Sequence, residues 1–159
     1  MTEQPFTHLD PSGQARMVDV SGKEVSLRTA TAVGMVSCPA AVVALLRSGS
    51  VPKGDVLAVA RIAGIAAAKR TPELLPLAHV IGVHGVVVDV EVVDTGVAIQ
   101  ATVRTVDRTG VEMEALTAVS VAALAIVDMV KGIDKHVQIE SVRLVAKDGG
   151  KSGPWRRDE

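Results

Sequence analysis

Charged residues suited to proton transfer stand at both ends of a long apolar segment in the second half of the chain. Glu112 and Glu114 flank Met113 at its start, and Asp128 and Lys131 stand near its end. Residues three apart share one face of a helix, so Asp128 and Lys131 would form an acid–amine pair able to exchange a proton. The alternative is that both sets of charges only complement the helix dipole.

The spacing between the two sets limits how they can act together. Glu114 and Asp128 are fourteen residues apart, which corresponds to about 21 Å along a helix. Side chains at that separation can serve one reacting centre only if a second subunit brings the opposite end of its own helix, or if the ligand is long.

Other cations stand at the ends of predicted elements. Lys53 precedes Asp55, a candidate N-cap, and anions bind well near a helix N-terminus. Lys69 is expected at a helix C-terminus, where a cation needs no function. Arg28 is expected on the outward face of a strand, where an arginine is commonplace.

Two further stretches match binding motifs only in part. His79 and His84 lack the spacing of a zinc site, and a lone histidine in an apolar connection is more often structural. Lys147 opens the stretch KDGGKSG, but Val145 replaces the first glycine of a phosphate-binding P-loop and no helix follows. We therefore predict no metal site and only a weak preference for anions at the tail glycines.

The composition excludes several classes of protein. The chain has 159 residues, 48% of them hydrophobic, and a formal net charge of −1, which fits one folded domain without a basic surface for nucleic acid. Phe6 and Trp155 are the only aromatic residues, so stacking platforms for bases are missing. The lone Cys38 and the polar N-terminus favour a reducing cytoplasm. The longest uncharged apolar run, residues 115–127, is too short to span a bilayer.

Hydrophobic periodicity predicts four strands and three helices. The expected elements are a strand over residues 25–35, helices over 38–49 and 51–72, a hairpin over 86–103, a helix over 111–131 and a strand over 137–145. In the first strand the face that carries Leu27 and Met35 is expected to be buried. A change of phase near Glu140 predicts a β-bulge in the last strand.

This order of elements predicts an α+β fold of ferredoxin-like type, a sandwich in which helices pack on a four-stranded antiparallel sheet, with one extra helix. We expect a flexible N-terminal arm over residues 1–16, a single catalytic domain over 17–147 and a mobile, glycine-rich tail over 148–159. The helix over 111–131 is apolar nearly all round, and one sheet covers only one of its sides. A homo-oligomer is therefore expected.

Six stretches, taken together, resemble one known family. They are MVDV at 17–20, KGDVLAVARIAGIAAAKRT at 53–71, LLPLAH at 74–79, RTGVEMEALTAVSVAAL at 108–124, DMVK at 128–131 and KDGGKSG at 147–153. Their combination, which covers nearly the whole chain, is similar to the cyclic pyranopterin monophosphate synthase (MoaC) family of molybdenum cofactor biosynthesis.

The resemblance implies a cytoplasmic lyase of ferredoxin-like fold that assembles as a homo-hexamer, a trimer of dimers, with active sites between subunits. Its substrate would be a cyclised dihydro-GTP supplied by a radical-SAM GTP cyclase. Its products would be cyclic pyranopterin monophosphate and pyrophosphate. The resemblance implies no cofactor, although Mg²⁺ could accompany the triphosphate.

The resemblance also implies roles for individual residues. Asp128 matches the catalytic acid/base, and Lys131 and Lys53 match catalytic lysines. The positions that match substrate-binding residues are Leu77, Ala78, His79, Met113 and Glu114 and, as further polar positions lining the pocket, Glu112, Lys69, Arg28 and Lys147. These types suit the substrate, because a triphosphate needs cations and a guanine-like edge offers N–H groups to a carboxylate.

One departure from the family pattern concerns the binding loop. The family commonly has Leu-Cys-His-Pro where this chain has Leu77-Ala78-His79-Val80. The change frees the loop and removes a polarisable contact, yet we expect an active enzyme. The alternatives are a non-catalytic nucleotide-binding module of the same fold and a supporting paralogue without turnover.

Overall fold

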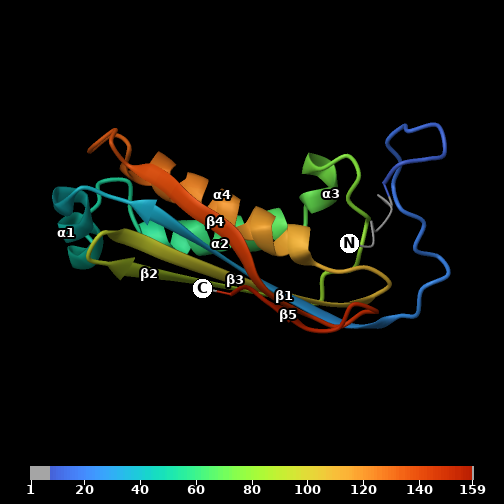
Figure 1. Cartoon of the computed structure of the whole chain (residues 1–159). Helices are drawn as coiled ribbons and strands as arrows, with labels where there is room; N and C mark the ends of the chain where they lie inside the picture. Colours follow the sequence, from blue (N-terminus) through green and yellow to red (C-terminus); the bar gives the residue numbers. More distant parts are fainter. Residues whose placement is uncertain (1–7, 159) are drawn as a thin grey trace.

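The computed structural model describes residues 8–158 as a single antiparallel sheet with its two main helices, α2 and α4, along one face (Figure 1). The strands are β1 (Ser26–Ser37), β2 (Gly85–Val93), β3 (Gly96–Asp107), β4 (Gln138–Asp148) and β5 (Trp155–Arg156), and the helices are α1 (Ala40–Ser48), α2 (Val56–Ala68), α3 (Thr71–Leu74) and α4 (Glu112–Val130). The strand order is β2-β3-β1-β4-β5. The first four of these strands have the predicted ferredoxin-like arrangement, so the α+β fold class is confirmed; the short β5 and α3 are additions to it.

Helix α4 is the centre of the core. It packs on β1, β3 and β4 with one side and on α2 with another. The small residues of α2 permit a close approach, since a Cβ on Gly64 would lie 2.9 Å from the main-chain oxygen of Ala118. By length and composition alone α4 could cross a membrane, but half of its length is buried inside the domain. Its apolar character therefore serves the core.

Several local predictions are confirmed. Asp55 caps α2, because its side chain accepts a hydrogen bond of 3.0 Å from the main-chain N–H of Ala58. The predicted bulge of β4 is present: Ser141 has a φ of +55°, and the pairing with β1 shifts register between Val33 and Met35. The cap thus begins α2, and the bulge bends β4, at the positions that the local sequence signals predicted.

The predicted buried face of β1 was wrong. Alternate small residues from Ala30 to Val36 face the helices, whereas Leu27 is 63% exposed. The reason is the close packing of α4, since a Cβ on Gly34 would lie 2.6 Å from the Cγ1 of Val119. Only small side chains fit there, and the larger ones occupy the other face. Arg28 belongs to the helix-side set of positions and not to the outward face as predicted.

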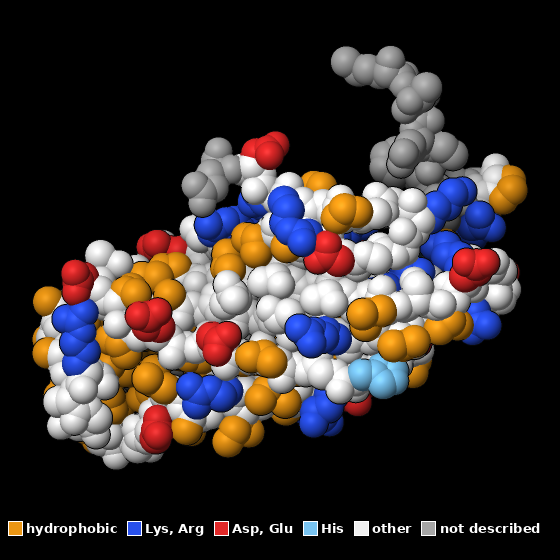
Figure 2. All heavy atoms as spheres, turned by 90° about the horizontal axis from the view of Figure 1, so that it is seen from below, with side chains coloured by type: hydrophobic (Ala, Val, Ile, Leu, Met, Phe, Trp, Pro, Cys, Tyr) orange, Lys and Arg blue, Asp and Glu red, His pale blue; other side chains and the backbone are white. Residues whose placement is uncertain are grey.

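The sheet face opposite the helices carries exposed apolar side chains, among them Leu27, Val87 and Val106. Figure 2, which views the molecule from below the orientation of Figure 1, shows groups of hydrophobic side chains separated by basic and acidic ones. The predicted homo-oligomer would bury side chains of this kind.

The two ends of the chain differ in extent from the predicted segments. Residues 8–16, the described part of the predicted arm, form a turn closed by a β-bridge, and residues 1–7 lie outside the described residues. Strand β4 continues to Asp148, just past the predicted domain end at residue 147, and β5 then pairs with it. The flexibility of both ends stays a prediction.

Candidate active site

Three charged side chains meet at the C-terminal end of α4. The Nζ of Lys131 lies 2.7 Å from Oδ1 of Asp128, and the Nζ of Lys53 lies 3.3 Å from Oδ2. Lys53 also donates a hydrogen bond of 2.7 Å to the main-chain oxygen of Asp128, across 75 residues of sequence. The structure therefore brings together all three residues expected to be catalytic.

The packing of α2 against α4 explains this meeting. The two helices run antiparallel, since Gly64 of α2 lies against Ala118 while Lys53, just before α2, reaches Asp128. Lys131 joins from the same helix, three residues further on. The side chains of Asp128 and Lys131 are 59% and 58% exposed, so a ligand or a partner subunit can reach the cluster.

The lysines keep the Asp128 carboxylate ionised. Hydrogen bonds from Lys131 and then from Lys53 lower the pKa of Asp128 below its usual range. Exposed ion pairs add little to stability, so the cluster is better suited to chemistry than to holding the fold. A carboxylate between two ammonium groups can accept a proton while a neighbouring lysine supplies one.

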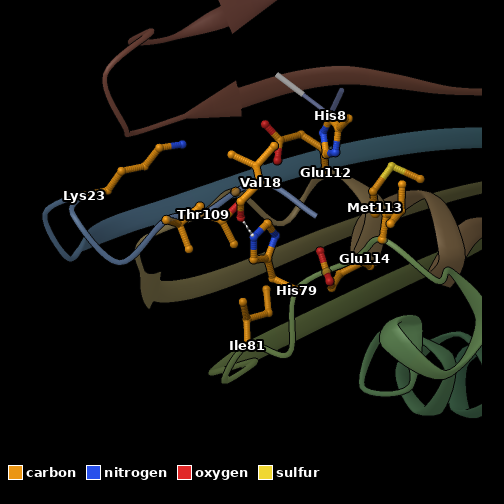
Figure 3. Close-up of a pocket in the computed structure, with 13 residues that line it drawn as sticks. His8, Val18, Lys23, His79, Ile81, Thr109, Glu112, Met113 and Glu114 are labelled. Carbon is orange, nitrogen blue, oxygen red and sulfur yellow. Dashed lines mark hydrogen bonds between the residues drawn. The ribbon is translucent and has the colours of Figure 1, made fainter. Parts of the chain in front are cut away.

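A pocket of about 250 Å³ lies at the opposite, N-terminal end of α4 (Figure 3). Its walls come from the segment before β1, the loop between α3 and β2, and the first turn of α4. The lining residues are His8, Val18, Val20, Lys23, Leu77, Ala78, His79, Ile81, Thr109, Gly110, Glu112, Met113 and Glu114. All the binding residues predicted in the loop and in the first turn of α4 therefore share one pocket.

His79 is held by the segment before β1. Its Nε2 lies 2.6 Å from the main-chain oxygen of Val18, and because a carbonyl only accepts, Nε2 must carry the proton. Whenever the ring is neutral, Nδ1 is therefore the nitrogen that can accept a hydrogen bond. In Figure 3 the carboxylate of Glu114 points toward this ring.

Glu114 is a buried acid, only 3% exposed. Burial, the largest cause, raises the pKa of Glu114, and the charge of Glu112 raises it further. A main-chain hydrogen bond and the nearby His79 act in the opposite direction. Compared with Asp128, this carboxyl group is therefore more easily protonated.

The remaining predicted cations lie at the same end of α4. Lys147 is 3.6 Å from the pocket residue Glu112, and the Nε of Arg28 donates a hydrogen bond of 2.9 Å to the main-chain oxygen of Asp107. Lys69 is the C-cap of α2, which the antiparallel packing places toward the start of α4. In the described part of the chain these three cations stand outside the set that lines the pocket.

Sequence reasoning assigned no role to several pocket residues, among them Val18, Lys23, Ile81 and Thr109. Val18 contributes through its main-chain oxygen, which carries no sequence signal. The Nε of Arg108 donates a hydrogen bond of 3.1 Å to the main-chain oxygen of Lys23. This bond connects the segment before β1 with the loop that precedes α4. Within residues 8–158 no group of three His, Cys, Asp or Glu side chains is placed to hold a metal ion.

The two positions that depart from the family pattern have different surroundings. Ala78 lines the pocket, whereas Val80 is 90% exposed. Of the two, only the alanine therefore belongs to the pocket wall that a single chain provides.

Comparison with known proteins identifies the family of the chain. The MoaC family profile matches residues 17–150. A Nocardioides protein named cyclic pyranopterin monophosphate synthase is 60% identical over 162 aligned residues that cover 99% of each chain. Proteins of the same name from Streptomyces coelicolor and Geobacter sulfurreducens are 64% and 54% identical, over 96% and 97% of this chain and 89% and 98% of their own. The chain belongs to the MoaC family.

Proposed function

We propose that this protein is a cyclic pyranopterin monophosphate synthase, a lyase of molybdenum cofactor biosynthesis that converts cyclised dihydro-GTP to cyclic pyranopterin monophosphate and releases pyrophosphate. One observation carries the proposal: Lys53, Asp128 and Lys131 meet at one end of α4, while the predicted binding residues line a pocket at the other end. Relatives that bear this name align with nearly the whole chain.

The charged cluster supplies the proton transfers. Opening of the purine-derived ring and closure of a cyclic phosphate both require protons to move between substrate atoms. Asp128, ionised between the lysines, acts as acid/base, and Lys131 at 2.7 Å is its proton partner. Lys53 holds the Asp128 carboxylate from the other side and acts as the second catalytic lysine.

The pocket recognises the substrate. The carboxylate of Glu114 and the free Nδ1 of His79 can accept hydrogen bonds from the N–H groups of a guanine-like edge. Leu77, Ala78 and Met113 provide the less polar wall. The cations Arg28, Lys69 and Lys147 are suited to the phosphates. The reaction needs no resident cofactor, and Mg²⁺ could arrive with the triphosphate.

The complete site lies between subunits. The cluster and the pocket are separated by about 21 Å within one chain, which is too far for one small reacting centre. In a homo-hexamer built as a trimer of dimers, the cluster of one subunit would face the pocket of its partner. The enzyme would work in the cytoplasm on an intermediate made by a radical-SAM GTP cyclase.

The decisive experiment supplies the purified protein with the cyclised dihydro-GTP and measures both pyrophosphate and the pterin product. We expect turnover in the parent and a loss of about 10²-fold or more in Asp128→Asn and Lys131→Ala. Lys135→Ala, an exposed lysine four residues beyond Lys131, is the matched control and should keep parental turnover. Equal rates in all four proteins would refute the proposal.

The altered loop favours one second candidate, a non-catalytic nucleotide-binding role. In that case the parent binds the intermediate without turnover. A revertant with Ala78→Cys and Val80→Pro then separates the explanations, since recovery of turnover would trace the loss to the loop. Failure to recover would favour the binding role.

A further inference from the structure

The glycine-rich segment between β4 and β5, residues 149–154, lies against the start of β1. Gly149 and Gly150 have φ angles of +88° and +76°, a region that favours glycine. A Cβ on Gly149 would overlap the main-chain oxygen of Leu27. The N–H of Gly153 donates a hydrogen bond of 3.1 Å to the main-chain oxygen of Gly150. The segment therefore has a shape that other residues could not adopt without moving β1.

Ser152 contacts one of the predicted substrate-binding cations. The Nζ of Lys147 donates a hydrogen bond of 2.7 Å to the Oγ of Ser152 and lies 3.6 Å from Oε1 of Glu112, a pocket residue. A lysine side chain loses considerable rotamer entropy when it is held in place. The hydrogen bond to the serine hydroxyl restricts the Lys147 side chain before a ligand binds, so less rotamer entropy is lost on binding. The ammonium group has three N–H donors, so two remain for a ligand and for Glu112.

Gly150 accommodates the other cation. A Cβ at this position would overlap the Nη1 of Arg28, so the guanidinium group lies directly over the glycine backbone. The Nε of Arg28 is already directed to the main-chain oxygen of Asp107 at 2.9 Å. This contact fixes the plane of the guanidinium group, and the two Nη groups are left to donate to a ligand.

We propose that Gly150 and Ser152 are positioning residues that hold Arg28 and Lys147 in place for the phosphate groups of the substrate. The identity of the ligand rests on the proposed function. The pairing of a planar guanidinium group with an ammonium group matches phosphate oxygens, because the first donates in a fork and the second acts as a point charge. The segment between β4 and β5 is then a working part of the site.

The test compares Gly150→Ala with Gly153→Ala. Both glycines have positive φ angles, but a Cβ on Gly153 meets nothing within 4 Å, so the pair separates backbone strain from the displacement of Arg28. Ser152→Ala removes the hydroxyl contact, and Ser152→Thr restores it. The measurements are KM and kcat for the cyclised dihydro-GTP, the Kd of pyrophosphate by calorimetry, and thermal unfolding.

We expect Gly150→Ala to raise KM and the pyrophosphate Kd about 10-fold, and Ser152→Ala about 3-fold, with kcat changed less than about 2-fold. Gly153→Ala and Ser152→Thr should stay close to the parent. If Gly150→Ala and Ser152→Ala both keep the parental KM and Kd, the inference is overturned. Turnover by the parent would still support the proposed function in that case. Equal losses in Gly153→Ala and Gly150→Ala, with lower thermal stability, would also overturn it, because they would indicate a structural role. If the parent shows no turnover, but Gly150→Ala and Ser152→Ala still weaken pyrophosphate binding as expected, only the proposed function is refuted.

Discussion

The two ends of α4 hold carboxyl groups in opposite environments. Asp128 is exposed between two lysines that lower its pKa, whereas Glu114 is 3% exposed and burial raises its pKa. The side chains differ by one methylene group, so the surroundings shift their pKa values in opposite directions. Two carboxyl groups whose environments separate their pKa values are suited to different steps of acid–base chemistry.

The ends also differ in how much of a site each one provides. The pocket at Glu114 is walled by its own chain, including the segment of Val18 that fixes His79. The cluster at Asp128 is exposed, and none of its three side chains lines the pocket at Glu114. One end thus offers the pocket that holds the predicted binding residues, and the other end offers the catalytic trio.

The strongest test of this division mixes two inactive proteins. Asp128→Asn subunits and Glu114→Gln subunits are unfolded, combined in equal amounts and refolded together. If each site takes its cluster and its pocket from different subunits, about a quarter of the sites in the mixed oligomers are intact. Activity should therefore return from near zero to about a quarter of the parental value.

The control for that experiment is a mixture of each variant with itself, which should stay inactive. Pyrophosphate release is the readout. No recovery in the mixture, when the parent refolds to full activity by the same procedure, would mean that each site is built within one chain.

A second prediction concerns the contact between α2 and α4, which brings Lys53 to Asp128. Gly64 lies where α2 crosses α4, and a Cβ there would lie 3.3 Å from the Cβ of Ala122 and 2.9 Å from the Ala118 oxygen. Gly64→Val should push α2 away, destabilise the protein by about 1–3 kcal/mol and draw Lys53 from Asp128. Denaturant unfolding and kcat measure the two effects. Gly132→Ala, which meets nothing within 4 Å, should leave stability unchanged; equal stability of both variants would show that the helix contact is loose.

The third prediction uses pH to compare the two carboxyl groups. The pKa of Glu114 is raised in the folded state from its ordinary value of 4.5, so its ionisation reduces stability as pH rises through the folded pKa. The pKa of Asp128 is lowered from 3.8, so its stabilisation is present above that value and is lost as pH falls through the folded pKa. Relative to the parent, Glu114→Gln should therefore gain Tm as the pH rises above the ordinary value of 4.5. Asp128→Asn should instead have a slightly lower Tm than the parent, and this difference should disappear in acid.

Thermal unfolding at fixed protein concentration measures both trends, and fixed concentration matters because an oligomer changes its Tm with dilution. Parallel curves for the parent and Glu114→Gln at every pH would show that Glu114 gains no raised pKa on folding.

The smallest expected effect concerns the ring of His79. Its hydrogen bond to the Val18 oxygen places the proton of the neutral ring on Nε2. Nitrogen NMR of the parent above neutral pH should show this tautomer for His79, with the exposed His136 as an internal comparison. A proton on Nδ1 would contradict the bond and remove the acceptor that we assign to substrate binding.

The sequence by itself determined the order of the elements and the chemical types at the site. Alternation of apolar residues, the Asp55 cap and the phase shift near Ser141 are local signals, and each depends on neighbours only a few residues away. The motifs around Glu114, Asp128 and His79 identified the family in the same way. These features could be read in advance because their physical causes lie within one turn or one strand.

Only the tertiary structure decided which groups touch. Lys53 and Asp128 are 75 residues apart in the sequence, and their contact depends on the antiparallel packing of α2 on α4. The buried face of β1 depends on how closely α4 approaches Gly34, and for that reason the sequence pattern predicted the wrong face. The raised pKa of Glu114 likewise follows from burial. Close packing between distant segments sets all three features, and no local pattern of residues encodes it.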